Sequence, residues 1–204
     1  MVQSHFMLMP ENLPRLCSLK IEEKCGRSKV RSMPMNSMRL HSLDFEPLSV
    51  AHFPLLFVWL NTPHVIQHWD GVQSIEEVEA KYGGKLESLD QRAFIVSKEG
   101  TPFAYIQKYR ASTVGGGWWP GEPDTTVGID QFIGSAAHLA KGLGTEVVRE
   151  FSDWLLLDPH TKRIITDPKP TNIRAIRCYK RAGFTESGLV ETPDGVALVM
   201  ERVG

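Results

Sequence analysis

Cysteine is scarce in this sequence, and long apolar runs are absent. Cys17, Cys25 and Cys178 form an odd set without a CxxC pair, which argues against a disulfide framework and a cysteine-bound metal. The seven histidines are scattered, so no metal site is predicted. No apolar run approaches the roughly 20 residues of a membrane span. The N-terminus also lacks the basic-then-apolar order of a secretory signal. The sequence therefore predicts a cytoplasmic, reduced protein without a membrane or a metal.

A strong charge of either sign is also lacking. The net charge of −1 argues against a nucleic-acid binder. The charge is unevenly spread, because residues 1–36 carry six basic side chains against three glutamates, which leaves about −4 for residues 37–204. A mild acidic bias suits a cationic small molecule as the partner.

The chain divides into a short extension and one domain. Its 204 residues are near the usual size of a single domain, and 42% hydrophobic content is enough for a core. Residues 1–36 combine three prolines and mixed charge with only fragments of periodicity. We therefore expect a poorly ordered extension over residues 1–36 and one folded domain over residues 37–204.

The pattern of apolar residues predicts an alternation of strands and helices in this domain. Strands are expected over residues 38–43, 93–97, 103–110, 127–133 and 163–166, with a final hairpin over 185–191 and 196–203. Helices are expected over residues 49–61, over 74–82 with Ser74 as the cap, and around 147–155. A last helix runs from a Thr171 cap to Ala182, with Gly183 as its terminator. The order predicts a mixed α/β sheet with helices packed on it.

A glycine-rich turn, KGLGT at residues 141–145, lies between a strand and an amphipathic helix. Glycines there let backbone N–H groups approach an anion, and the helix dipole favours negative charge at that end. A pyrophosphate fits this turn, but neither the GxGxxG spacing nor the P-loop lysine is present. Such turns also serve packing alone, so both interpretations stay open.

The last predicted helix presents Asn172, Ala175 and Tyr179 on one face. A small residue between an amide and a phenol leaves room for a thin ligand. Tyr179 is then placed to donate a proton to a departing thiolate. The alternative is that Tyr179 packs on the sheet, as helical aromatic residues usually do.

These elements together resemble the GNAT superfamily of acetyl-CoA-dependent N-acetyltransferases. The matching residues are those of the turn at 142–145, followed by Asn172, Arg174, Ala175, Tyr179, Gly183 and Phe184. Further segments look like the aminoglycoside 6′-N-acetyltransferases, namely GWW at 117–119, GIDQ at 128–131, TDP at 166–168 and TPDG at 192–195. The resemblance covers approximately residues 38–201.

The resemblance implies a mostly antiparallel sheet that is splayed at the acetyl-CoA site, with helices on both faces. It also implies direct attack of the acceptor amine on the thioester in a ternary complex. Asp130 and Tyr179 are then the catalytic residues. The expected cofactor-binding residues are Phe132, Ile133, Lys141, Gly142, Leu143, Gly144, Thr145, Asn172 and Ala175.

The acceptor implied by the resemblance is a small-molecule aminoglycoside, acetylated on its 6′-amine, which would confer antibiotic resistance. The expected acceptor-binding residues are Trp69, Gln107, Tyr109, Trp118, Trp119, Asp130, Asp167 and Asp194. Asp130 lies in an otherwise apolar strand, where a carboxylate needs a partner. That partner is either the acceptor or an internal Arg or Lys. The protein is expected to be a monomer or a weak homodimer.

Three positions depart from the pattern of these families. Leu139 replaces the usual Gln or Arg before the phosphate turn, Ala140 replaces a frequent glycine, and His68 replaces an expected aromatic residue. Two other functions therefore stay open. One is acetylation of a lysine-derived, siderophore-type amine, and the other is a non-catalytic acyl-CoA-binding regulator.

Overall fold

The computed structural model describes residues 37–114 and 118–204. The predicted extension over residues 1–36 and Gly117 of the GWW segment lie outside them. The strands are β1 (Met38–Leu40), β2 (Leu43–Pro47), β3 (Gln91–Lys98), β4 (Thr101–Arg110), β5 (Thr126–Ile133), β6 (Arg163–Thr166), β7 (Thr185–Thr192) and β8 (Gly195–Val203). The α-helices are α1 (Phe53–Leu60), α2 (Pro63–Ile66), α3 (Ile75–Tyr82), α4 (Leu143–Leu156) and α5 (Ile173–Arg181). Four 3-10 turns complete the set, η1 (Val50–His52), η2 (Gly83–Lys85), η3 (Ala111–Thr113) and η4 (Ala136–His138).

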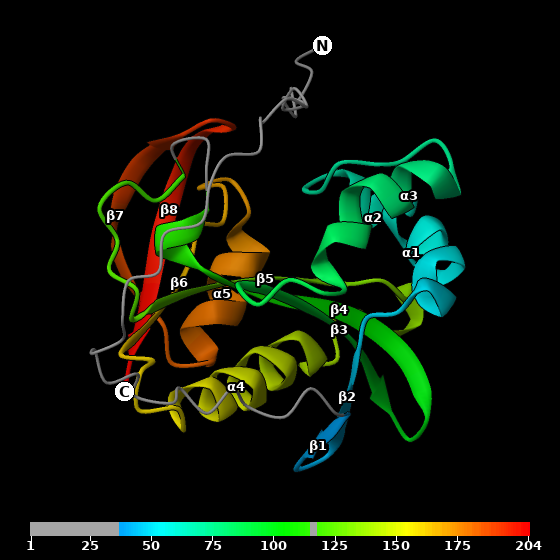
Figure 1. The fold of residues 1–204 in the computed structure, drawn as a ribbon, viewed down its shortest axis with the longest axis horizontal. Coiled ribbons are helices and arrows are strands. Elements are labelled where there is room, and N and C mark those ends of the chain that lie inside the picture. Colours follow the sequence, from blue (N-terminus) through cyan, green and yellow to red (C-terminus); the bar gives the residue numbers. More distant parts are fainter. Residues whose placement is uncertain (1–36, 115–117) are drawn as a thin grey trace, which may run out of the picture. The chain divides into compact units, whose positions relative to one another are not determined.

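The eight strands form one sheet in the order β1-β2-β3-β4-β5-β6-β8-β7 (Figure 1). Every pair in it is antiparallel except β5 with β6. That parallel pair joins only three residues of each strand, from Thr126 with Arg163 to Gly128 with Ile165. β5 then continues to Ile133 paired with β4 alone. The sheet is therefore splayed beyond Gly128, as expected.

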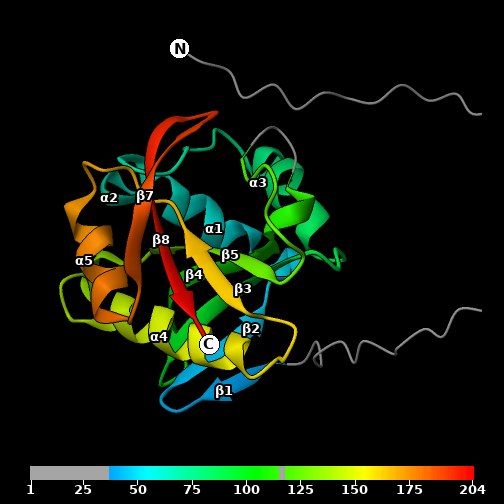
Figure 2. The same cartoon turned by 90° about the vertical axis from the view of Figure 1, so that its left-hand side faces the viewer.

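Helices cover both faces of the sheet because the strand side chains alternate between two cores. On β3, Phe94 and Val96 pack into the core beneath α4 and α5, whereas Ala93 and Ile95 pack into the core under α1 and α3. Figure 1 and Figure 2 show α1, α2 and α3 above the sheet and α4 below it. This arrangement confirms the mixed α/β fold class.

Short elements were not predicted. Residues 38–43 form no single strand, because the chain turns at His41 (φ 45°) and returns as β2. β2 was missed, although Leu43 and Phe45 are fully buried in it. The four-residue helix α2 was also missed. The helix α2 is too short to show a helical period in sequence, and the start of β2 lies within the strand expected over residues 38–43.

Helix ends mostly agree with the predictions. Ser74 caps α3 by accepting a hydrogen bond from the Glu77 N–H, and Gly183 ends α5 with φ 97°. The predicted Thr171 cap is wrong. Asn172 is the cap of α5, because its Oδ1 accepts the Ala175 N–H at 3.1 Å. Within the described residues, no helix is both long and apolar enough to cross a membrane.

Candidate active site

The phosphate turn lies at the N-terminus of α4, after β5. Gly142 is the residue before the helix and has φ 79°, a conformation that favours glycine. The first N–H groups of an α-helix lack carbonyl partners within it, so together with the helix dipole they can hold an anion. The side chain of Leu143 is buried in the core. Leu143 can therefore contact a bound anion only through its backbone N–H.

Ala140 lies just before this turn, at the position where a glycine is frequent in the family. It also has a positive φ, of 59°. An alanine in this region costs about 1–2 kcal/mol. Glycine has no such cost but loses about 0.5–1 kcal/mol more backbone entropy on folding. We therefore expect Ala140→Gly to stabilise the fold by up to about 1 kcal/mol, measured by denaturant unfolding. Ala137→Gly, at an exposed position in η4 without positive φ, should destabilise it instead. A loss of stability in both variants would contradict the account of the turn.

The turn contacts the neighbouring helix and strand at Gly144. A Cβ added at Gly144 would meet Cys178 Sγ at 3.5 Å and Gln131 Nε2 at 3.7 Å. Thr145 Oγ1 lies 3.7 Å from Cys178 Sγ. Burial raises the pKa of the Cys178 thiol, so this cysteine is a poor nucleophile. It therefore supports direct transfer rather than an acyl-enzyme.

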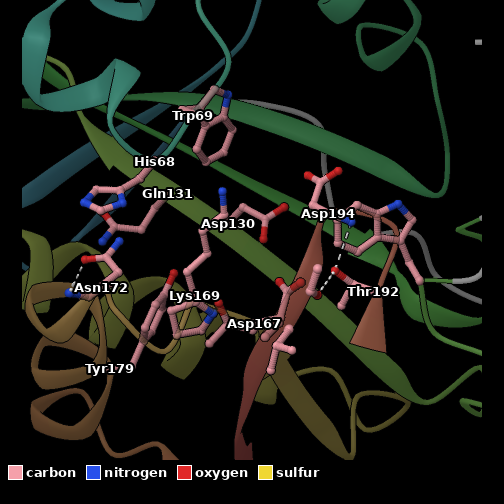
Figure 3. Close-up of a pocket in the computed structure, with 17 residues that line it drawn as sticks. His68, Trp69, Asp130, Gln131, Asp167, Lys169, Asn172, Tyr179, Thr192 and Asp194 are labelled. Carbon is pink, nitrogen blue, oxygen red and sulfur yellow. Dashed lines mark hydrogen bonds between the residues drawn. The ribbon is translucent and has the colours of Figure 1, made fainter. Parts of the chain in front are cut away.

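Asn172, Ala175 and Tyr179 line a cavity of about 180 Å³ between α5 and β5. Figure 3 shows Asn172 and Tyr179 entering it from α5. Tyr179 is only 4% exposed and packs edge-on against Phe184 at 5.5 Å. Both interpretations of Tyr179 therefore apply, because its ring packs in the core and the residue also lines the cavity. Burial raises the pKa of Tyr179 well above its usual value, so the phenol keeps its proton.

Asp130 lies at the junction of this cavity and a second one of about 490 Å³, and lines both. Its Oδ2 accepts a hydrogen bond from Gln107 Nε2 at 2.7 Å. Burial raises the pKa of Asp130, while the Gln107 bond and the charge of Lys85 oppose that rise. Asp130 has no ion pair within 4.0 Å among the described residues. The predicted alternative of a direct internal salt bridge is therefore not seen.

The second cavity is acidic. Asp167 and Asp194 line both cavities together with Asp130, and Figure 3 shows all three around one opening. Burial first, and then the charges of Asp130 and Asp194, raise the pKa of Asp167 to about 8. In the described part of the chain, Lys169 is the only Lys or Arg lining either cavity. A nearby positive charge favours the ionised form of such crowded carboxyl groups, so this cavity is suited to an acceptor that carries several ammonium groups.

Aromatic side chains also line the two cavities. Trp69 and Trp118 line both cavities, and Trp119 and Tyr109 line the second. The Tyr109 ring fits only because residue 128 is glycine, since a Cβ there would lie 2.1 Å from it. Flat rings of this kind can stack on sugars.

Some predicted site residues lie outside both cavities. The side chain of Phe132 is stacked on Tyr105 at 5.1 Å, within the core. Phe132, Ile133 and the phosphate turn of Lys141, Gly142, Leu143, Gly144 and Thr145 line neither cavity. Their assignment to the cofactor remains a prediction, which rests on the splayed strand and the start of α4.

Sequence reasoning missed Lys85 and Tyr105, which both donate to Gln107 Oε1, at 2.6 and 2.7 Å. Gln107 itself was predicted to bind acceptor hydroxyls. It lines the second cavity, but two protein donors already occupy its carbonyl oxygen. Lys85 follows α3 in a short Gly-Gly-Lys segment, and no motif marks it.

The chain matches the family described as "Acetyltransferase (GNAT) domain" over residues 49–192. A relative from Klebsiella pneumoniae, aminoglycoside N(6′)-acetyltransferase type 1, is 42% identical over 151 residues, covering 72% of this chain and 75% of the relative. A kanamycin resistance protein from Rhizobium radiobacter is 52% identical over 86 residues, covering 42% of this chain and 80% of its own length.

The fold is also similar to solved structures of aminoglycoside acetyltransferases. The structure of AAC(6′)-Ib in complex with paromomycin and acetyl-CoA has a TM-score of 0.76 and 36% identity, covering 80% of this chain and 94% of that one. The complex of AAC(6′)-Ib with coenzyme A and kanamycin has a TM-score of 0.75 and 36% identity. The match covers 79% of this chain and 95% of that one.

Proposed function

The chain belongs to the GNAT acetyltransferase family, and from that premise we propose that it acetylates the 6′-amine of aminoglycosides with acetyl-CoA. The resemblance that the sequence showed is thereby confirmed. One relative is named for this activity and another for kanamycin resistance, and both names support an aminoglycoside over a siderophore-type amine as the acceptor. Acetylation at this position would confer resistance to the antibiotic.

The observation that carries the proposal is the junction of the two cavities. Asp130, Asp167 and Asp194 gather there, within the cavity that Asn172 and Tyr179 also line. A polycationic sugar in the larger cavity would thus present an amine to a thioester held beside α5. Acetyl-CoA would place its pyrophosphate on the start of α4 and its pantetheine arm along the edge of β5 that no longer pairs with β6 beyond Gly128.

The chemistry requires the acceptor ammonium to lose two protons, one before the attack and one as the amide forms, and one proton to reach the departing thiolate. An ammonium cannot attack, so Asp130 binds it and removes a proton. The free amine attacks the thioester carbonyl, the carbon–sulfur bond breaks, and the nitrogen gives up its second proton to solvent as the amide forms. Tyr179 is the proposed donor to the departing thiolate, because its phenol is still protonated at neutral pH.

The test is a comparison of two acceptors that differ at one group. Coenzyme A release is measured with kanamycin and with an aminoglycoside that has a hydroxyl in place of the 6′-amine. We expect release with kanamycin only, and thermal stabilisation by both acceptors because their other ammonium groups remain. Equal release with both would overturn the assignment of the 6′-amine.

Residues 1–36 are proposed to be dispensable, because all the described residues that line the two cavities lie between Ile66 and Ala197. A chain starting at Met35 should keep kcat and both KM values within about twofold of the full chain. Steady-state kinetics on both proteins provide the measurement. A folded but inactive shortened chain would show that the extension belongs to the site.

One copy of the chain carries residues for both reactants in the proposed site. We therefore propose a monomer or weak homodimer that acts on a small molecule in the cytoplasm, where acetyl-CoA is available.

A further inference from the structure

Lys85 is a half-buried cation in η2, directly after α3, beside the candidate site. Its Nζ donates to Gln107 Oε1 at 2.6 Å and lies 4.6 Å from the centre of the Tyr82 ring. Among the described residues, Lys85 forms no ion pair within 4.0 Å. A cation in such a place needs compensation, because burying an unpaired charge is costly. The nearest polar route from it leads through Gln107 to Asp130.

The direction of the hydrogen bonds along this route is determined by Lys85. An ammonium has donors only, so Gln107 must turn its Oε1 towards Lys85. Tyr105 donates to the same oxygen at 2.7 Å. The Gln107 NH₂ group therefore faces Asp130, where it donates to Oδ2 at 2.7 Å. This polarity matches an ionised Asp130, because a carboxylate only accepts.

We propose that Lys85 is a positioning residue that acts through Gln107 to hold Asp130 as an oriented carboxylate, ready to accept the proton of the acceptor ammonium. The inference rests on the proposed function. It makes Gln107 a bridge between a cation and the base rather than a binder of acceptor hydroxyls. Lys85 touches neither reactant in this scheme.

The electrostatics agree with the geometry. Burial raises the pKa of Asp130, and the positive charge of Lys85 lowers it again. Burial lowers the pKa of Lys85 to about 8, so the ammonium is the main form at neutral and acidic pH. Removing this charge should raise the pKa of Asp130. Because Asp130 works as the carboxylate, the rise of activity with pH should then occur at higher pH.

Other titratable groups also face Asp130, and the test must separate them. They are Tyr82 of α3, Tyr105 and Tyr109 of β4, Tyr179 of α5 and, around the two cavities, Asp167 after β6 and Asp194 before β8. The four tyrosines stay neutral at neutral pH, because burial raises the pKa of each. Asp167 is the carboxyl to remove first, because its pKa of about 8 falls within the pH range of the assay. An Asp167→Asn background removes it.

The experiment compares the pH dependence of kcat/KM for kanamycin in wild type, Lys85→Met and Lys85→Arg, each with and without Asp167→Asn. In Lys85→Met we expect the acidic limb to move up by about one pH unit, which is about tenfold lower activity on that limb. The KM for acetyl-CoA should not change. Lys85→Arg keeps the charge and the donor and should keep the wild-type limb. Lys85→Gln replaces the methionine variant if that protein does not fold.

An acidic limb of Lys85→Met that superimposes on the wild type would overturn the proposal, even if the melting temperature falls. Failure of the proposed function is recognised separately, because wild type would then release no coenzyme A with kanamycin. In that case the pKa of Asp130 is followed by carbon-13 NMR of aspartate-labelled protein, with the signal assigned by Asp130→Asn. The proposal requires this pKa to be higher in Lys85→Met than in wild type, and an unchanged pKa contradicts it.

Discussion

Asp130→Asn should lower kcat with kanamycin by about 10³-fold and leave the affinity for acetyl-CoA close to wild type. The amide keeps the size of the side chain but cannot accept a proton from the acceptor ammonium. Acetyl-CoA is held elsewhere, by the start of α4 and by α5. Stopped-time assays of coenzyme A release and a binding titration with acetyl-CoA measure the two quantities on one preparation.

The control for this variant is Asp153→Asn, which changes an exposed aspartate on α4 outside both cavities. It should turn over like wild type. Asp167→Asn should raise KM for the acceptor more than it lowers kcat, since Asp167 is proposed to bind rather than to react. Wild-type turnover in Asp130→Asn would remove Asp130 from the mechanism.

Tyr179→Phe should reduce turnover by about 10²-fold or more, with acceptor affinity nearly unchanged. The phenylalanine ring keeps the contact with Phe184 but has no proton to give the thiolate. The melting temperature should change little, because one lost hydrogen bond is worth only about 1 kcal/mol. Turnover and melting temperature are measured together, so that lost activity is not mistaken for unfolding.

Two outcomes would change the role of Tyr179. A fall of only a few fold means that water protonates the thiolate while Tyr179 lines the cavity. A variant that both melts and turns over like wild type shows that the tyrosine is packing alone. A large fall in melting temperature would also place its main contribution in the core.

The parts of the site that could be predicted from sequence lie on long regular elements or tight local turns. Asn172, Ala175 and Tyr179 share a face because α5 has a helical period, and all three line one cavity. Gly142 was expected in the turn before α4, and its φ of 79° explains why glycine is suited there. Both features depend on residues close in sequence.

The parts that could not be predicted depend on residues far apart in the chain. Lys85 and Gln107 are separated by 22 positions and meet only when α3 packs beside β4. The cap of α5 was placed one residue early, because Thr171 and Asn172 are both good cap residues and sequence does not choose between them. Lys169 of the cavity wall lies between two prolines, in a segment that reads as an ordinary turn.

The central claim is that this chain transfers an acetyl group to one particular amine of the antibiotic. Kanamycin and acetyl-CoA are incubated with the enzyme, and the purified product is assigned by two-dimensional NMR. The account requires a single new amide at the 6′-nitrogen and one coenzyme A released for each product formed. Acetylation at a different amine, or no acetylated kanamycin beside a properly folded protein, would show the claim to be wrong.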